Sequence, residues 1–100
     1  MTEKIIVEVD RELEDLMPLF TQTRQRDMDG LAAGLAASDF DALRMIGHGM
    51  KGSGGAFGFP LITVMGDAIE VAALKLDHAA VSQQLALLRS YLGSIEIKYV

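Results

Sequence analysis

Apolar residues recur at three- and four-residue spacing through most of the chain, which is the periodicity of amphipathic helices. The first of these stripes begins after Asp10, a suitable N-cap, and Pro18 is expected to kink this helix or to restart it. Its apolar members are Leu13, Leu16, Met17 and Phe20. Before it, the β-branched run Ile5–Val9 predicts a short extended arm.

Longer helices are predicted at residues 27–37, 39–58, 61–76 and 79–97. Pro60 ends the second of them, because the residue before a proline avoids the helical region. Short breaks between helices favour antiparallel neighbours. The predicted fold class is therefore all-α, an antiparallel up-down four-helix bundle with an additional short N-terminal helix, and strand content is expected to be close to nil.

Length and composition narrow the class of protein. A chain of 100 residues has material for one core, so a single domain over residues 1–100 is predicted. The absence of Cys excludes a disulfide framework, Cys-ligated zinc and a thiol nucleophile, and the cytoplasm is the expected compartment. No segment has the pattern of a signal peptide or the roughly 18 apolar residues of a membrane span. A net charge of -5 argues against a nucleic-acid partner and favours a protein partner.

Glycine is concentrated in one part of the chain. Of the 10 glycines, six lie within residues 47–58, inside a segment whose apolar spacing is helical. Each glycine in a helix interior lowers helix stability by about 1 kcal/mol relative to alanine. Six glycines in one helical segment therefore call for a structural or functional explanation. Glycine is usually found where the backbone has a positive φ angle or where another molecule or chain segment approaches the backbone closely.

A helical wheel with about 100° per residue places His48 on the outer side of this segment. The apolar residues on the opposite side are Leu43, Ile46, Met50 and Phe57. The residues that share the outer side with His48 are Arg44, Lys51, Gly52 and Gly55. An isolated histidine is more often a surface or core residue than a reactive one. Here the imidazole is exposed, a lysine lies one turn away, and the neighbouring glycines leave the surface without side chains. This pattern favours the interpretation that His48 is a nucleophile and that Lys51 stabilises negative charge beside it.

The residues around His48 resemble the motif of histidine-containing phosphotransfer (HPt) domains of multistep two-component phosphorelays. The segment HGMKGS at residues 48–53, followed by GGAFGF, is similar to the family motif H-x-[LF]-K-G-[SAT] and its trailing small residues. Glu70, just after Ile69, is similar to a recurrent Leu-Glu pair of the family. Gly49 replaces the frequent Ser or Thr and Met50 the usual Leu, and neither change removes a reacting group.

The resemblance implies that His48 accepts a phosphoryl group from a receiver-domain aspartate and passes it to another receiver, while Lys51 stabilises the phosphoryl oxygens. The implied partner-binding surface consists of Arg44, Met45, Gly52, Gly55 and Phe59. The receiver would supply Mg²⁺, so neither a metal site nor a cofactor is expected in this chain. The protein would be a phosphocarrier without ATP-dependent kinase activity, and no Walker A motif is present.

The expected partners are response-regulator receiver domains and a hybrid sensor histidine kinase, and a monomer is the simpler expectation. Two other functions stay open: a non-transferring adaptor that binds a receiver or another signalling protein, and a structural helical subunit that dimerises through residues 79–97. The sequence identifies neither the receiver nor the direction of phosphate flow. Its ends fit a free-standing module and equally a piece of a larger kinase.

Two other signals are attributed to structure. Gly47-x-Gly49-x-x-Gly52 has the spacing of a dinucleotide fingerprint, but that fingerprint needs a strand before it, and here a helical stripe runs through it. His78 follows Asp77 at a helix break and is expected to be a solvated or capping residue. The two histidines lack the spacing of metal ligands.

Overall fold

The computed structural model describes residues 4–100, so residues 1–3 of the predicted single domain lie outside the described residues. Four α-helices make up most of this part of the chain, which confirms the prediction of a mainly helical fold. They are α1 (Met17–Ala37), α2 (Phe40–Ser53), α3 (Pro60–Leu74) and α4 (His78–Ser94). Two short 3-10 helices, η1 (Arg11–Leu16) and η2 (Gly55–Phe57), and two strands, β1 (Ile5–Val9) and β2 (Ile95–Tyr99), complete it.

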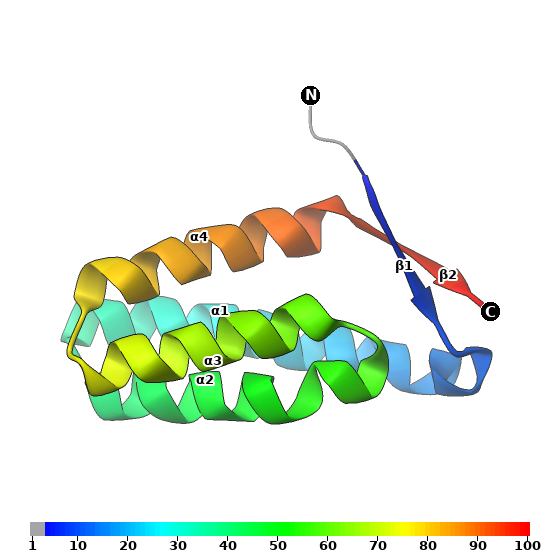
Figure 1. Ribbon diagram of the computed structural model, residues 1–100. Coiled ribbons are helices and arrows are strands. Elements are labelled where there is room, and N and C mark those ends of the chain that lie inside the picture. Colours follow the sequence, from blue (N-terminus) through cyan, green and yellow to red (C-terminus); the bar gives the residue numbers. More distant parts are fainter. Residues whose placement is uncertain (1–3) are drawn as a thin grey trace.

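The helices lie side by side, and the two strands project from one end of the bundle (Figure 1). Three of the helices begin at sites that the sequence marks clearly. The side chain of Asp39 accepts a hydrogen bond from the backbone N–H of Ala42, and that of Asp77 accepts one from Ala80, so α2 and α4 both begin at an aspartate N-cap. Pro60 stands at the start of α3, where its missing N–H leaves no helical bond unmade.

The N-terminal helices differ from the prediction. One continuous helix, α1, covers the predicted break between Phe20 and residue 27, and the segment before it is the 3-10 helix η1. Pro18 lies in the first turn of α1, where proline is tolerated, and therefore starts this helix instead of kinking it.

The expectation of almost no strand is wrong. β1 and β2 form a parallel pair in which Ile5 lies opposite Ile95 and Val9 opposite Tyr99. Residues 95, 97 and 99 repeat with period two and are half-buried, whereas residues 96 and 98 are exposed, which is the pattern of a strand. The prediction carried helical periodicity through to residue 97, but α4 ends at Ser94 and Ile95 already has extended φ and ψ angles.

The helix predicted at residues 39–58 also ends earlier, at Ser53. The chain then makes the single turn of η2, and Gly58 adopts a φ angle of 86°, a left-handed conformation that glycine takes without strain. This turn brings Phe57 and Phe59 onto Phe20, with ring centroids 4.9 and 4.7 Å from that of Phe20. Residues 4–100 contain no helix with both the length and the apolar character needed to cross a membrane.

Candidate functional site

Helices α2 and α3 touch through their backbones, and glycine makes this contact possible. A Cβ atom added to Gly47 would lie 2.7 Å from the backbone nitrogen of Glu70 and 2.8 Å from the carbonyl oxygen of Gly66. Real Cβ atoms essentially never come that close to backbone, so a side chain at Gly47 would force the helices apart. The contact sets the next residue of α2, His48, beside Glu70 on α3.

The His48 side chain points outward and is 72% exposed, as the helical wheel predicted. Its Nδ1 lies 2.8 Å from Oε2 of Glu70, whose side chain is only 16% exposed. A carboxylate only accepts hydrogen bonds, so the ring proton of a neutral His48 resides on Nδ1. Nε2, which has no hydrogen-bond partner among residues 4–100, then carries the lone pair.

Lys51 lies one turn from His48 and contacts two carboxylates of α3. Its Nζ is 3.0 Å from Oδ1 of Asp67 and 3.6 Å from Oε1 of Glu70. The hydrogen bond to Asp67 and the charges of both carboxylates raise the pKa of the Lys51 ammonium above its ordinary value of 10.5. The two oxygens of Glu70 therefore face two different partners, the imidazole and the ammonium.

Three of the other predicted partner-binding residues lie on the exposed surface of this region. The Met45 side chain is 61% exposed and lies one turn before His48 on the same side of α2. A Cβ atom on Gly52 would meet nothing within 4 Å, and one on Gly55 would make only an ordinary contact of 3.6 Å with Oγ1 of Thr63. The packing of this chain therefore does not require glycine at either position.

Arg44 is not brought to the group formed by His48, Glu70 and Lys51. Its guanidinium pairs with Asp41 on the same helix, at 2.9 Å between Nη2 and Oδ1. The side chain of Arg44 is 37% exposed and that of Asp41 77%, and a pair so open to solvent contributes little to stability. The cation stays available at the surface, with a carboxylate of its own beside it.

Phe59 does not belong to an exposed docking surface, which corrects the prediction. Its side chain is 0% exposed and its ring stacks on that of Phe20. The prediction carried helical geometry past Ser53, whereas the turn of η2 directs the chain inward before Pro60 begins α3.

The role of α3 in the site was missed by reasoning from the residues alone. Glu70 was noted only through the family resemblance, and Asp67 was not noted at all. Two exposed valines flank Asp67 on the same side of α3, Val64 at 61% and Val71 at 41% exposure. The signal that was available is the glycine in each of two neighbouring helices, Gly47 and Gly66, which marks where helices can approach closely.

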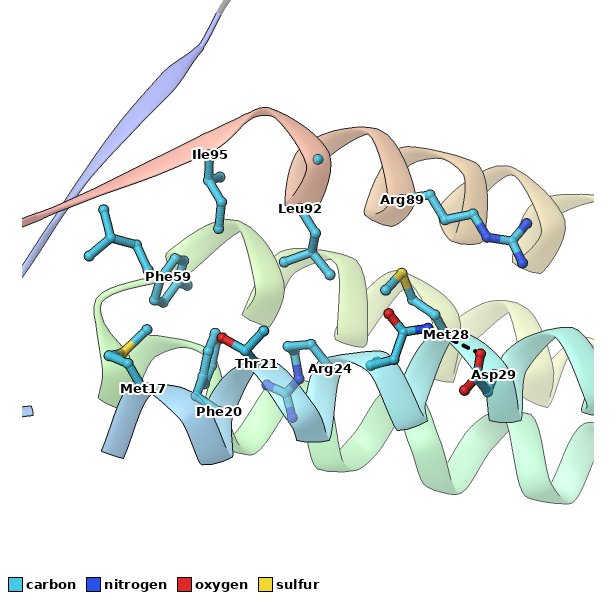
Figure 2. A pocket seen from close by; sticks show the side chains of 13 residues that line it. Met17, Phe20, Thr21, Arg24, Met28, Asp29, Phe59, Arg89, Leu92 and Ile95 are labelled. Atoms are coloured by element: carbon cyan, nitrogen blue, oxygen red, sulfur yellow. Dashed lines mark hydrogen bonds between the residues drawn. The ribbon is translucent and has the colours of Figure 1, made fainter. Parts of the chain in front are cut away.

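A hollow of about 480 Å³ lies elsewhere in the fold, between α1, α4 and β2 (Figure 2). Met17, Phe20 and Phe59 lie at one end of it, and Arg89 and Asp29 are among its polar lining residues. It shares no residue with the group around His48. Among residues 4–100, no three His, Asp or Glu side chains are arranged to hold a metal ion.

Comparison with known proteins agrees with the resemblance around His48. The sequence profile of the Hpt domain family matches residues 15–96, which include all four α-helices and the whole group around His48. No match was found among curated proteins or among solved structures. Because the profile covers more than half of the chain, this protein belongs to the Hpt domain family.

Proposed function

We propose that this protein is a phosphorelay intermediate that accepts a phosphoryl group on Nε2 of His48 from the aspartyl phosphate of a receiver domain and passes it to another receiver. Hpt domains are phosphocarrier modules of two-component phosphorelays and not kinases, and they interact with receiver domains and histidine kinases. The observation that carries the proposal is the exposed His48 ring with Nδ1 hydrogen-bonded to Glu70 at 2.8 Å.

The hydrogen bond to Glu70 prepares the ring for attack. The lone pair of Nε2 forms a bond to phosphorus while the bond from phosphorus to the aspartyl oxygen breaks, and the aspartate leaves as a carboxylate. The Nδ1 proton stays on the ring, so the phosphorylated imidazole carries a positive charge. The carboxylate of Glu70, 2.8 Å from Nδ1, stabilises that charge as it develops. The return step reverses the same bonds.

Lys51 supplies positive charge for the phosphoryl oxygens. It is on the same side of α2 as His48, and its side chain is 46% exposed. Little covalent chemistry is left to the protein in phosphoryl transfer, so positioning and charge account for most of the acceleration. The receiver would contribute Mg²⁺ and the acidic pocket around its phosphorylated aspartate.

The docking surface follows from the exposure of residues around His48. Met45 on α2 and the two valines of α3, Val64 and Val71, give it an apolar border. Gly52 and Gly55 leave the backbone of α2 and η2 bare, so a receiver can approach the histidine closely. Arg44 is proposed to steer the acidic pocket of the receiver toward this surface.

A transfer assay tests the proposal. The protein is mixed with a panel of phosphorylated receiver domains in Mg²⁺, and the phosphate that reaches it is tested for acid lability and stability in alkali. His48→Gln should keep its circular dichroism spectrum and lose all labelling. His78→Gln is the matched control, because His78 is the other histidine of the chain. Its one side-chain hydrogen bond within residues 4–100 joins Nε2 to the carbonyl oxygen of Leu35, at 3.0 Å.

Unchanged labelling of the folded His48→Gln protein would refute the assignment of the phosphorylated residue. Binding of receivers without labelling of the wild-type protein would refute transfer and favour the adaptor.

The architecture around the site carries two further proposals. We propose that residues 1–100 form one domain in which the four α-helices follow an antiparallel up-down order, with η1 as the additional N-terminal helix. We also propose that the protein is a monomer. A single cooperative unfolding transition and a monomer mass in sedimentation are the expected results, and a stable dimer would contradict the second proposal.

A further inference from the structure

The ammonium of Lys51 is bound more closely to Asp67 than to the carboxylate that holds the histidine. Its Nζ is 3.0 Å from Asp67 and 3.6 Å from Glu70. Glu70 is committed to Nδ1 of His48, whereas residues 4–100 offer Asp67 no hydrogen bond or ion pair other than that to Lys51. Asp67 is also the more accessible of the two carboxylates, with a side chain 53% exposed.

A phosphoryl group on Nε2 of His48 would compete with Asp67 for the same cation. The phosphoryl group carries about two negative charges and three acceptor oxygens, so it attracts a nearby ammonium strongly. Asp67 and Glu70 both draw the ammonium of Lys51 toward α3, whereas Nε2 is the ring nitrogen of His48 that does not contact Glu70. The attraction of the two carboxylates therefore opposes a move of the ammonium toward phosphoryl oxygens on Nε2. The 3.0 Å contact with Asp67 raises the pKa of the Lys51 ammonium, as expected when a neighbouring carboxylate favours the charged form.

We infer that Asp67 is a positioning residue that holds Lys51 away from the phosphoryl site and so limits how tightly His48 retains the phosphoryl group. This inference rests on the proposed function. A carrier has to release what it accepts, and a cation free to pair with the phosphoryl oxygens at all times would stabilise the phosphorylated state more than onward transfer needs. Asp67 opposes that stabilisation without touching the histidine.

Phosphoramidate, a small donor that needs no receiver, is the probe for this inference. Nε2 of His48 forms a bond to phosphorus, the nitrogen–phosphorus bond of the donor breaks, and its protonated amine leaves as ammonia. With ammonium added at a fixed concentration the reaction reaches an equilibrium. ³¹P NMR measures the amount of phosphohistidine at His48, and the total protein concentration then gives the ratio of phosphorylated to free His48.

Asp67→Asn keeps the size of the side chain and removes its charge. It should raise this equilibrium ratio about two- to five-fold, the range expected when an exposed ion pair is removed from the competition. In a Lys51→Met background the same Asp67→Asn change should have no effect, because the cation for which the two groups compete is gone. Asp29→Asn is the matched control, since Asp29 is an exposed aspartate on α1 whose side chain accepts one hydrogen bond, from Gln25, and forms no ion pair within residues 4–100.

A second readout follows the ion pair without any phosphoryl transfer. The pKa of the Lys51 ammonium, measured by NMR titration of its side chain, should fall in Asp67→Asn and stay unchanged in Asp29→Asn.

An equilibrium ratio in Asp67→Asn equal to that of the wild-type protein would overturn the inference while leaving the proposed function intact. An equal increase in the Lys51→Met background would overturn it too, because the effect would then come from net charge alone. If the wild-type protein is labelled at His48 neither by phosphoramidate nor by receivers, the proposed function itself fails.

Discussion

Replacing Gly66 with alanine tests whether backbone contact between α2 and α3 builds the site. A Cβ atom on Gly66 would lie 2.6 Å from the carbonyl oxygen of Gly47 and 2.8 Å from Cβ of Met50, and it would also collide with the backbone nitrogen of Lys51. Ordinary contacts begin near 3.4 Å, and the backbone nitrogen of Lys51 is the nearest of the three atoms, so the two helices must separate by about 1 Å.

The energetic result of Gly66→Ala is a balance of two terms. Overpacking of a closed contact costs about 1–3 kcal/mol, and the clash is mainly with the backbone of α2, which cannot rotate away as a flexible side chain can. Alanine regains about 1 kcal/mol of helix propensity. Taking the upper end of the packing cost, we expect a net loss of about 2 kcal/mol, which lowers the melting temperature of a domain of this size by about 8–16 °C.

Thermal and urea unfolding followed by circular dichroism measure this loss, and Gly93→Ala in α4 is the control. A Cβ atom on Gly93 would meet nothing within 4 Å, so its alanine variant should be as stable as the wild-type protein or up to about 1 kcal/mol more stable. The ring signals of His48 in NMR spectra should shift in Gly66→Ala, because Glu70 moves with α3. A Gly66→Ala protein at least as stable as the wild type would refute the argument.

Three further changes test other parts of the structure. Gly52→Gln should leave the melting temperature within a few degrees of the wild type and slow phosphoryl transfer from a receiver at least ten-fold, and normal transfer would contradict the proposed close approach. Burial raises the pKa of Asp27 and the charge of Arg24 opposes this rise, so Arg24→Met should raise that pKa further and lower the free energy of unfolding by about 2–3 kcal/mol at pH 7. The folded state of that variant then binds a proton more readily than the unfolded state, so its loss of stability should shrink as the pH falls toward 4; equal losses at pH 7 and 4 would be inconsistent with this. Val9→Ala should cost about 2 kcal/mol because Val9 is 1% exposed, whereas Glu8→Ala on the other face of β1 should change stability by less than about 0.5 kcal/mol in urea unfolding.

The helical part of the fold could be predicted because its signals are local. Asp39 and Asp77 cap the helices that follow them, and Pro60 begins α3, each through the geometry of a few neighbouring residues. The β1–β2 pair could not be found in this way. The run Ile5–Val9 was predicted to be extended, as it is, but its pairing partner lies 90 positions away, as for Val7 and Ile97. The run of residues 95–99 taken alone is too short to distinguish a strand from the end of a helix.

The residues that α2 contributes to the site could be predicted, and those that α3 contributes could not be placed from the residues alone. His48 and Lys51 are three residues apart on one helix, so a wheel places them together. Glu70 comes from another helix, and its position depends on the packing of α2 against α3. The exposure of Phe59 was predicted wrongly because the helical wheel was continued beyond Ser53, where α2 has already ended.

Four of the glycines of α2 and of the turn after it form two pairs with opposite consequences. Gly47 and Gly54 face inward and are buried, and a Cβ atom on either would lie 2.7 Å from a backbone nitrogen of α3, so they are required for the packing that brings Glu70 to His48. Gly49 and Gly52 face outward, where a Cβ atom would meet nothing within 4 Å, so alanine there would gain helix propensity. A chain selected for stability alone would therefore keep the inner pair and replace the outer pair. Gly49 stands where the family frequently has Ser or Thr, so this position needs no bare backbone. Under the proposed function, Gly52 leaves the backbone bare where a receiver domain has to approach His48 closely.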